Sequence, residues 1–415
     1  MWTRYIIECG TCQKLSNLRL QIPEREKMPI SFECGNCKSE ISGTLLVDFK
    51  KPEFKYESTR GKVLEDAKYD DGDYFVEFSD TLKVAKPSTS PHNIVLPTLR
   101  TNTGSFEKSK MTKDLRKLQS DEEWQDFKDL CKVYPNNKAA IKTLSYRILE
   151  RIYPKYLYEI KIEPDYRRNF FMSLNYFVFP WIDKQNHKTY IDYLSKELFG
   201  IADYNDPEIN SLTGTVLDDK RNGKIIRDSL DLIIRWIELR DYFHYVVHDT
   251  TATQVHASVE NFTALKNFYT DCFELIGREG DLVFRCQNIS ERGSQDSIPA
   301  GCPRNVTDAN SFQTLDNGRK LDIINLSSNP EPKSIFVHSF KSKLRNGINH
   351  NKAKFDAKNQ IIKYYPITKR PDEEHRITYI EFLKVALDSF NSVLKILQLT
   401  KMRSNYIYFK AKNGL

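Results

Sequence analysis

Two short segments, "CGTC" (residues 9–12) and "CGNC" (residues 34–37), decide the fold at the start of this chain. Each contains two cysteines three positions apart, and 21 residues separate one pair from the other. Two thiolates at this spacing on a tight turn can bind the same tetrahedral metal ion. Four thiolates leave no open coordination position, so the spacing predicts a structural metal site. The predicted ligands are Cys9, Cys12, Cys34 and Cys37.

The residues around these cysteines resemble a zinc ribbon, which implies one structural Zn2+ per chain and a small β module over residues 1–50. The segments "KLSNLRLQI" and "MPISFE" between the pairs are strand-like. Gly10 and Gly35 are predicted to let each turn bend toward the sulfur atoms. Zinc ribbons contact protein, RNA or DNA, and a regulatory protein partner is one of the alternatives that stay open.

The composition predicts a folded protein of two or three domains. The chain has 415 residues, 40% hydrophobic and 12% aromatic, which is enough to build cores and excludes a wholly disordered chain. The formal charge of +7 permits an RNA or DNA partner without requiring one. The N-terminus lacks a signal peptide pattern, and the longest apolar-rich stretch (residues 170–182) is too short for a membrane span. We therefore expect a cytoplasmic protein without membrane contact.

The middle of the chain is predicted to contain a linker followed by helices. Residues 51–115 contain strand-like segments and then a linker rich in Pro, Ser and Thr, and residues 116–222 form a helical middle region. Its residues 153–177 alternate aromatic and basic side chains, which suits single-stranded RNA but also suits an aromatic core with a basic edge. We expect the stretches 201–224 and 285–332 to be loops. Four further cysteines are expected to be buried or unused thiols, namely Cys131, Cys272, Cys286 and Cys302.

The C-terminal part, residues 223–415, is predicted to be a helical bundle with a small β-hairpin insert, which makes the chain mainly α. Its apolar periodicity predicts four helices, at 223–247, 257–277, 333–352 and 379–399. The hairpin lies between the last two. His244 and His248 are four residues apart on the first of these helices, a spacing compatible with metal binding, but no third ligand is near and we expect them to face the bundle.

The stretch "LRNGINHNK" (residues 344–352) is the candidate active site. Arg345 and His350 form an R-x4-H pattern, but Arg370 and His375 match it too, so the spacing alone decides nothing. Asn346 lies four residues before His350, so the two share a helix face in a basic surrounding. Gly347 is expected to let a second chain approach closely.

The stretch "RNGINH", with the helices before and after it, resembles the RN-x3-H signature of HEPN domains. The resemblance covers about residues 223–400 and implies a metal-independent endoribonuclease, in which the 2′-hydroxyl of RNA attacks the adjacent phosphate and leaves a 2′,3′-cyclic phosphate. It implies His350 as general acid or base, Arg345 as the group that stabilises charge on phosphorus, and Asn346 as the orienting residue. It also implies a homodimer and a toxin-like role in antiviral defence or abortive infection.

Two other interpretations remain open. The polar residues around Arg345 can serve helix capping and solvation, in a non-catalytic nucleic-acid-binding protein that uses the zinc ribbon and its basic helices. The ribbon can also be a protein-interaction module that restrains the C-terminal domain. Salt-dependent RNA binding without cleavage products would favour the first of these two.

Overall fold

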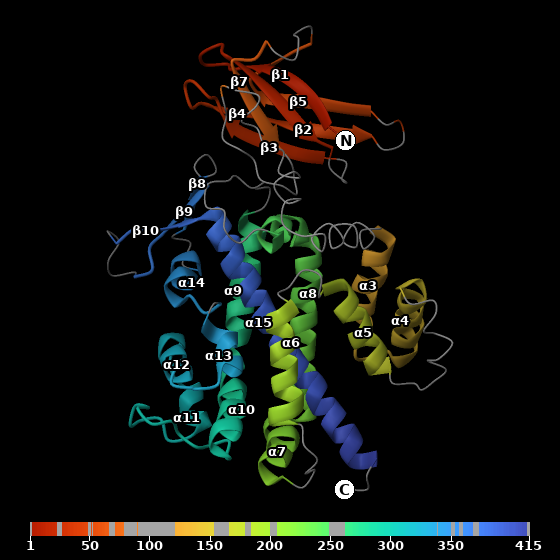
Figure 1. The fold of residues 1–415 in the computed structure, drawn as a ribbon, viewed down its shortest axis with the longest axis vertical. Coiled ribbons are helices and arrows are strands. Elements are labelled where there is room, and N and C mark those ends of the chain that lie inside the picture. The colour runs from red at the N-terminus through yellow and green to blue at the C-terminus, as the bar shows by residue number, and fades with distance from the viewer. Residues whose placement is uncertain are drawn as a thin grey trace. The chain divides into compact units, whose positions relative to one another are not determined.

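The computed structural model confirms a mainly helical chain with small N-terminal sheets around four cysteines and a small C-terminal sheet (Figure 1). The chain divides into two compact units, Met1–Lys113 with Leu239–Ala264 and Gly347–Lys384, and Asp114–Glu238 with Leu265–Asn346 and Val385–Leu415. The predicted domain ranges 1–50, 51–115, 116–222 and 223–415 stay predictions. The structure describes residues 2–22, 27–48, 51, 53–65, 71–78, 89, 121–152, 166–178, 184–199, 206–248, 262–337, 339–349, 353–356, 360–367 and 373–412.

Seven strands form two N-terminal sheets. The first sheet has the order β6-β1-β2-β7, in which β7 runs parallel to β2 and the other pairs are antiparallel. The second sheet is antiparallel with the order β3-β4-β5. The bounds are β1 (Trp2–Glu8), β2 (Leu15–Gln21), β3 (Lys27–Glu33), β4 (Glu40–Asp48), β5 (Glu53–Arg60), β6 (Lys62–Leu64) and β7 (Tyr74–Phe78).

Both N-terminal sheets contribute to one hydrophobic core. Alternate residues of β4 are buried, as expected for a strand with one face toward a core. Leu18 of the first sheet and Leu45 of the second are fully buried in the same cluster, together with Cys9 and Cys34. Strands β5, β6 and β7 pair with β4, β1 and β2, so the predicted boundary at residue 50 falls between strands that are hydrogen-bonded to one another.

Helices α3 (Asp121–Val133), α4 (Lys138–Ile152) and α5 (Tyr166–Val178) confirm the helical middle region. Stacked rings join α3 and the turn after it to α5, because Phe127 lies 4.5 Å from Phe177 and Tyr134 lies 3.8 Å from Phe170, centroid to centroid. The linker residues 79–88 and 90–120 and the segment 153–165 lie outside the described residues.

The long helices α8 (Asp219–His248), α9 (Phe262–Arg278) and α15 (Tyr379–Lys412) confirm the predicted C-terminal helices, although α8 starts earlier and α15 ends later than expected. Trp236 of α8 stacks on Phe390 of α15 at 5.1 Å, and Phe268 of α9 lies 5.6 Å from the same ring. Among the described helices, none is both long enough and apolar enough to cross a membrane.

The predicted loops at 201–224 and 285–332 are wrong in large part, because short capped helices occupy them. Asp206 accepts hydrogen bonds from the N–H groups of Glu208 and Ile209, and Asp308 and Ser311 form a capping box. Polar composition conceals such helices, since the capping residues are those that also favour turns. The elements are α7 (Pro207–Ser211), η4 (Leu212–Val216), α10 (Gly280–Arg292), α11 (Ala309–Gln313), α12 (Asn317–Ile324) and the start of α13 (Pro330–Val337).

The single helix predicted over 333–352 is also wrong, because the chain breaks between α13 and α14 (Ser342–Asn349). The carbonyl of Ser339 accepts from the hydroxyl of Ser389 on α15 at 3.2 Å and from the N–H of Lys341 at 3.1 Å. Its two lone pairs are therefore occupied, and it does not accept the hydrogen bond from the N–H of Lys343 that a continuous α-helix would contain.

The predicted β-hairpin insert is present as a sheet of three antiparallel strands, β8 (Lys354–Asp356), β9 (Ile361–Tyr364) and β10 (His375–Thr378), in the order β10-β9-β8. Ile362 at its centre is fully buried. The sheet directly precedes α15, which starts at Tyr379.

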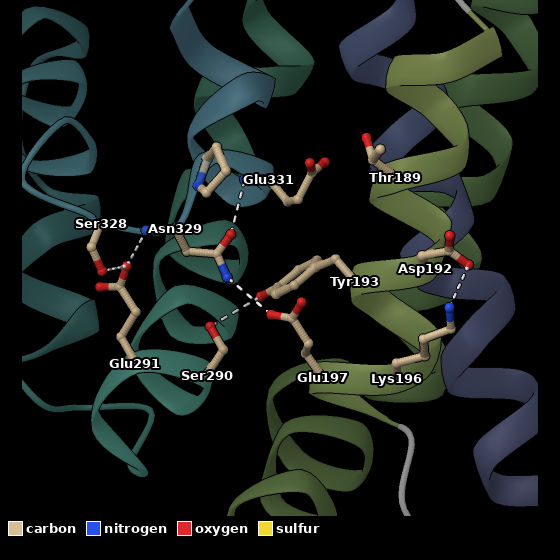
Figure 2. Close-up of a pocket in the computed structure, with 11 residues that line it drawn as sticks. Thr189, Asp192, Tyr193, Lys196, Glu197, Ser290, Glu291, Ser328, Asn329 and Glu331 are labelled. Carbon is tan, nitrogen blue, oxygen red and sulfur yellow. Dashed lines mark hydrogen bonds and ion pairs between the residues drawn. The ribbon is translucent and has the colours of Figure 1, made fainter.

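A pocket of about 620 Å³ lies between α6 (Lys184–Asp192) with η3 (Tyr193–Leu198), α10 and α13 (Figure 2). Asp192, Glu197 and Glu291 line it and have partners within the protein, whereas Oε2 of Glu331, also in the lining, is buried without a hydrogen-bond partner among the described residues. Glu291 accepts from the hydroxyl of Ser328 at 3.1 Å and from the N–H of Asn329 at 2.6 Å, and the amide of Asn329 donates to Glu197. These bonds tie α10 and η3 to the start of α13.

Candidate functional site

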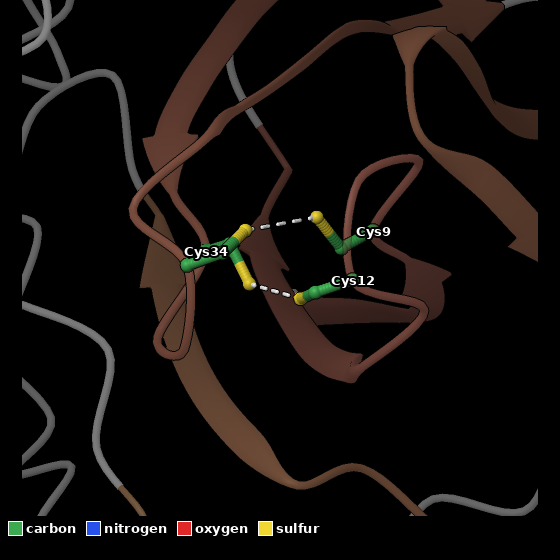
Figure 3. A group of neighbouring side chains, drawn as sticks. Cys9, Cys12 and Cys34 are labelled. Carbon is green, nitrogen blue, oxygen red and sulfur yellow. Dashed lines mark hydrogen bonds between the residues drawn. The ribbon is translucent and has the colours of Figure 1, made fainter.

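The four predicted cysteine ligands meet at one point in the N-terminal sheets (Figure 3). Cys9 and Cys12 lie in the turn between β1 and β2, and Cys34 and Cys37 lie in the turn between β3 and β4. Each cysteine pair therefore belongs to the hairpin turn of a different sheet, and the site joins the two sheets.

The two cysteine turns have the same backbone geometry. The N–H of Cys9 donates to the carbonyl of Lys14, and the N–H of Gln13 donates back to the carbonyl of Cys9. Cys34 makes the equivalent pair of bonds with Ser39 and Lys38. Gln13 (φ 59°) and Lys38 (φ 61°) are left-handed, one residue after the second cysteine of each turn.

The predicted role of the turn glycines needs a correction. Neither Gly10 nor Gly35 has a positive φ, because the left-handed conformation falls on the residues that follow the second cysteines. A Cβ atom at Gly10 would meet nothing within 4 Å, whereas one at Gly35 would collide with the ring of Tyr74. Gly35 is therefore required for space beside β7, and Gly10 is not.

The four sulfur atoms lie close enough together to bind one metal ion. All four sulfur atoms lie within 4.8 Å of one another, and the pairs Cys9–Cys37 and Cys12–Cys34 are both 3.6 Å apart. A tetrahedron with metal–sulfur bonds of about 2.3 Å has sulfur atoms about 3.8 Å apart. Cys9 and Cys34 are buried, while Cys12 and Cys37 are partly exposed. The four cysteines can hold one metal ion.

The surroundings differ between the four thiols. Hydrogen bonds with the side chain and backbone of Ser39 lower the pKa of Cys37 to about 6, whereas burial raises the pKa of Cys34 to about 12. The lowered pKa of Cys37 favours the thiolate, the form in which a cysteine binds a metal ion. Burial also raises the pKa of the thiols Cys131, Cys272, Cys286 and Cys302, which fits their expected lack of chemistry.

The second candidate site contains Arg345 and Asn346 on α14. The Nη1 group of Arg345 donates to Oδ1 of Asn346 at 3.1 Å. The other edge of the guanidinium contacts the carboxylate of Glu274 on α9, with Nε donating to Oε1 at 2.7 Å. The Cζ atom of Arg345 lies 5.9 Å from the ring centroid of Phe273. In the sequence, the neighbours of Arg345 are mostly basic. The structure adds an acidic partner, Glu274, which lies 71 positions earlier in the chain.

Gly347 does not show the open space expected for a second chain. A Cβ atom there would lie 2.6 Å from Cδ2 and 2.9 Å from Cβ of Tyr364 on β9. The close approach at Gly347 is thus made by the same chain. The local sequence contains no signal for this contact, because Tyr364 lies at the end of β9, which follows β8 along the chain.

Several predicted residues lie outside the described part of the chain. His350 follows the last residue of α14 and is not among the described residues, and neither are the side chains of His244 and His248. Arg370 of the second R-x4-H match is also outside them. His375 of that match starts β10, where its Nε2 lies 3.0 Å from Oε1 of Glu373.

Comparison with known proteins adds no relative. No protein-family model matches the chain, and neither a curated protein nor a solved structure matches it. The functional interpretation therefore depends on the residues themselves.

Proposed function

We propose that this chain is a metal-independent endoribonuclease of the HEPN type. In this reaction the 2′-hydroxyl of RNA attacks the adjacent phosphate and leaves a 2′,3′-cyclic phosphate and a 5′-hydroxyl. The observation that carries the proposal is the hydrogen-bonded pair Arg345 and Asn346 on α14, with His350 four positions after Asn346 in the sequence. The candidate roles therefore belong to three residues within six positions.

Each residue has a role that its chemistry suits. His350 takes the proton of the 2′-hydroxyl or supplies one to the leaving oxygen, because an imidazole changes charge near neutral pH. Arg345 stabilises the negative charge that develops on the phosphoryl oxygens. Asn346 uses its Oδ1 atom to orient the guanidinium, and its amide hydrogens can be donated to the phosphate or to His350.

Glu274 sets a condition on this mechanism. It pairs with Arg345, whose side chain is 26% exposed, while the carboxylate side chain is 47% exposed. An RNA phosphate must share or replace this carboxylate to reach the guanidinium. The exposed ion pair is weak enough to be exchanged, since such pairs contribute less than about 1 kcal/mol.

The ion in the cysteine site is Zn2+ in a structural role, because four thiolates and a tetrahedral arrangement favour zinc. The resemblance to HEPN domains suggests a homodimer in which two copies of the Arg345 site face one shared cleft, a cytoplasmic location and a toxin-like role in antiviral defence. RNA is the substrate.

The test is cleavage of a labelled RNA in buffer containing EDTA, with zinc content checked before and after. We expect cleavage by the unaltered protein, products that end in a 2′,3′-cyclic phosphate, and loss of cleavage in Arg345→Ala and His350→Ala. His375→Ala is the matched control from the second R-x4-H match and should cleave normally. Cleavage that needs added divalent metal, or that survives both substitutions, contradicts the proposal.

A second candidate is a non-catalytic nucleic-acid-binding or regulatory protein. The observation that favours it is the Glu274 carboxylate, which already neutralises Arg345. It predicts RNA binding that weakens with salt, without products. In this case the ribbon can bind a regulatory partner, which deletion of the N-terminal sheets would test. The deletion should remove residues 1–78 and not only 1–50, because β5 and β7 pair with strands of the ribbon.

A further inference from the structure

The outward side of α4 carries cations and one exposed aromatic ring. Ile141 and Ile148 are buried on an adjacent side of the helix. Lys138, Lys142 and Tyr146 recur every four residues, so they lie on one exposed stripe. Tyr146 is 51% exposed and lies in the same row as the two lysines.

Positive charge exceeds negative charge on this side of α4. Within the described residues, no carboxylate forms an ion pair with Lys138 or Lys142. Arg147 and Arg151 both contact the carboxylate of Asp126, with N–O distances of 3.1 Å each. Arg147 remains 51% exposed, and Glu150 is an exposed acid of the same helix.

The start of α5 adds a second ring surrounded by cations. The Nζ atom of Lys138 lies 5.8 Å from the ring centroid of Tyr166, and the Cζ atom of Arg167 lies 5.7 Å from the same centroid. The first turns of α4 and α5 both lack acidic residues. Within the described residues, cations therefore outnumber acids on this surface, where Glu150 is the acid four positions after Tyr146.

We propose that this surface, the α4 face, binds single-stranded RNA. It is made by Lys138, Lys142, Tyr146, Arg147, Tyr166 and Arg167. Cations contact the phosphates of a single strand, and exposed rings stack on its unpaired bases. An acidic protein would use the cations but would gain nothing specific from a free tyrosine ring. This inference rests on the RNA partner of the proposed function, and it assigns RNA binding to a module separate in sequence from Arg345.

The test is the binding of fluorescein-labelled oligo(U) to the full chain, measured by fluorescence anisotropy at several salt concentrations. All proteins carry His350→Ala so that the RNA stays intact. Lys138→Ala with Lys142→Ala should weaken binding and reduce the salt slope by about 1.4, because each lost phosphate contact in a single strand removes about 0.7. Tyr146→Ala should weaken binding roughly 5- to 100-fold with an unchanged slope.

The matched control is Lys220→Ala with Lys224→Ala, which removes two exposed lysines at the same spacing from the start of α8. It should bind oligo(U) as the parent protein does. The inference is overturned if the α4 variants bind like this control, or if polyglutamate competes as well as oligo(U). Binding through the α4 face without any cleavage by the protein that retains His350 would uphold this inference and contradict the ribonuclease proposal.

Discussion

Cys9 and Cys37 lie in the turns of different sheets, yet their sulfur atoms are only 3.6 Å apart. A metal ion bound between them connects β1–β2 to β3–β4 at the edge of the common core. Because binding to such a site contributes directly to folding, its loss should loosen both sheets together.

The first prediction is that Cys9→Ser removes the metal and exposes the N-terminal sheets. Metal analysis should find one zinc ion per chain in the unaltered protein and much less in the variant. Limited proteolysis should then cut within residues 2–78, while the helices stay protected. Cys302→Ser is the control, since Cys302 is a partly exposed thiol outside the cluster and should keep the zinc. Equal metal content in both variants would rule out the cysteine site.

The second prediction concerns Arg221 at the start of α8, which holds two carboxylates. Its Nη2 atom lies 3.0 Å from Oε2 of Glu279 and 2.6 Å from Oδ1 of Asp281. The carboxylate side chains are only 3% and 10% exposed. Arg221→Met should therefore lower the free energy of unfolding by about 3 kcal/mol, the lower end for a broken buried pair, because Glu279 then depends on Arg278 and Asp281 on the more distant Arg285.

Arg235 on the same helix provides the comparison. Its partners Asp231 and Asp271 are 64% and 45% exposed, so Arg235→Met should cost less than about 1 kcal/mol. Urea unfolding followed by circular dichroism measures both variants. Similar losses of stability in the two variants would show that burial does not strengthen the ion pairs of Arg221.

Local patterns were enough for the parts of the fold that depend on neighbours in sequence. The spacing of Cys9, Cys12, Cys34 and Cys37 was sufficient to predict the cluster, because each pair occupies one turn. The apolar periodicity was sufficient for α8, α9 and α15, whose length makes the pattern unambiguous. The short helices near Asp206 and Asp308 were missed, although Asp206-Pro207 is a recognisable start signal for a helix.

The candidate site near Arg345 was less predictable, because its contacts come from distant parts of the chain. Glu274 stands on another helix, and Tyr364 reaches Gly347 from a strand. Periodicity gives the face of a helix but does not say which residue of another element will meet it. The ion pair and the filled space at Gly347 therefore required the structure.

The third prediction is a loss of stability on mild acidification that depends on His187. This residue is 3% exposed, and burial, with a further contribution from Lys395 and Lys401, lowers its pKa to about 3. The unfolded chain, in which a histidine has a pKa of about 6.5, binds this proton first, so stability falls as the pH drops from 6.5 toward 3. At pH 5 the loss is about 2 kcal/mol.

His187→Phe should remove this part of the pH dependence, which is measured as the change in urea midpoint between pH 7 and pH 5. His375→Gln is the control, because it removes a partly exposed histidine of β10 instead of a buried one. An unchanged slope in His187→Phe would mean that other groups cause the acid sensitivity.

The fourth prediction separates two explanations for Gly347. If its lack of a side chain serves Tyr364, Gly347→Ala should destabilise the chain by about 1 kcal/mol, because the overlap outweighs the better helix propensity of alanine. In a Tyr364→Gly background the same change should become neutral or stabilising, since the overlapping atoms are gone. If the glycine instead serves contact with a second chain, Gly347→Ala should leave the stability of the monomer unchanged and weaken dimerisation, which light scattering after size exclusion would detect. The filled space beside Tyr364 leads us to expect the first result.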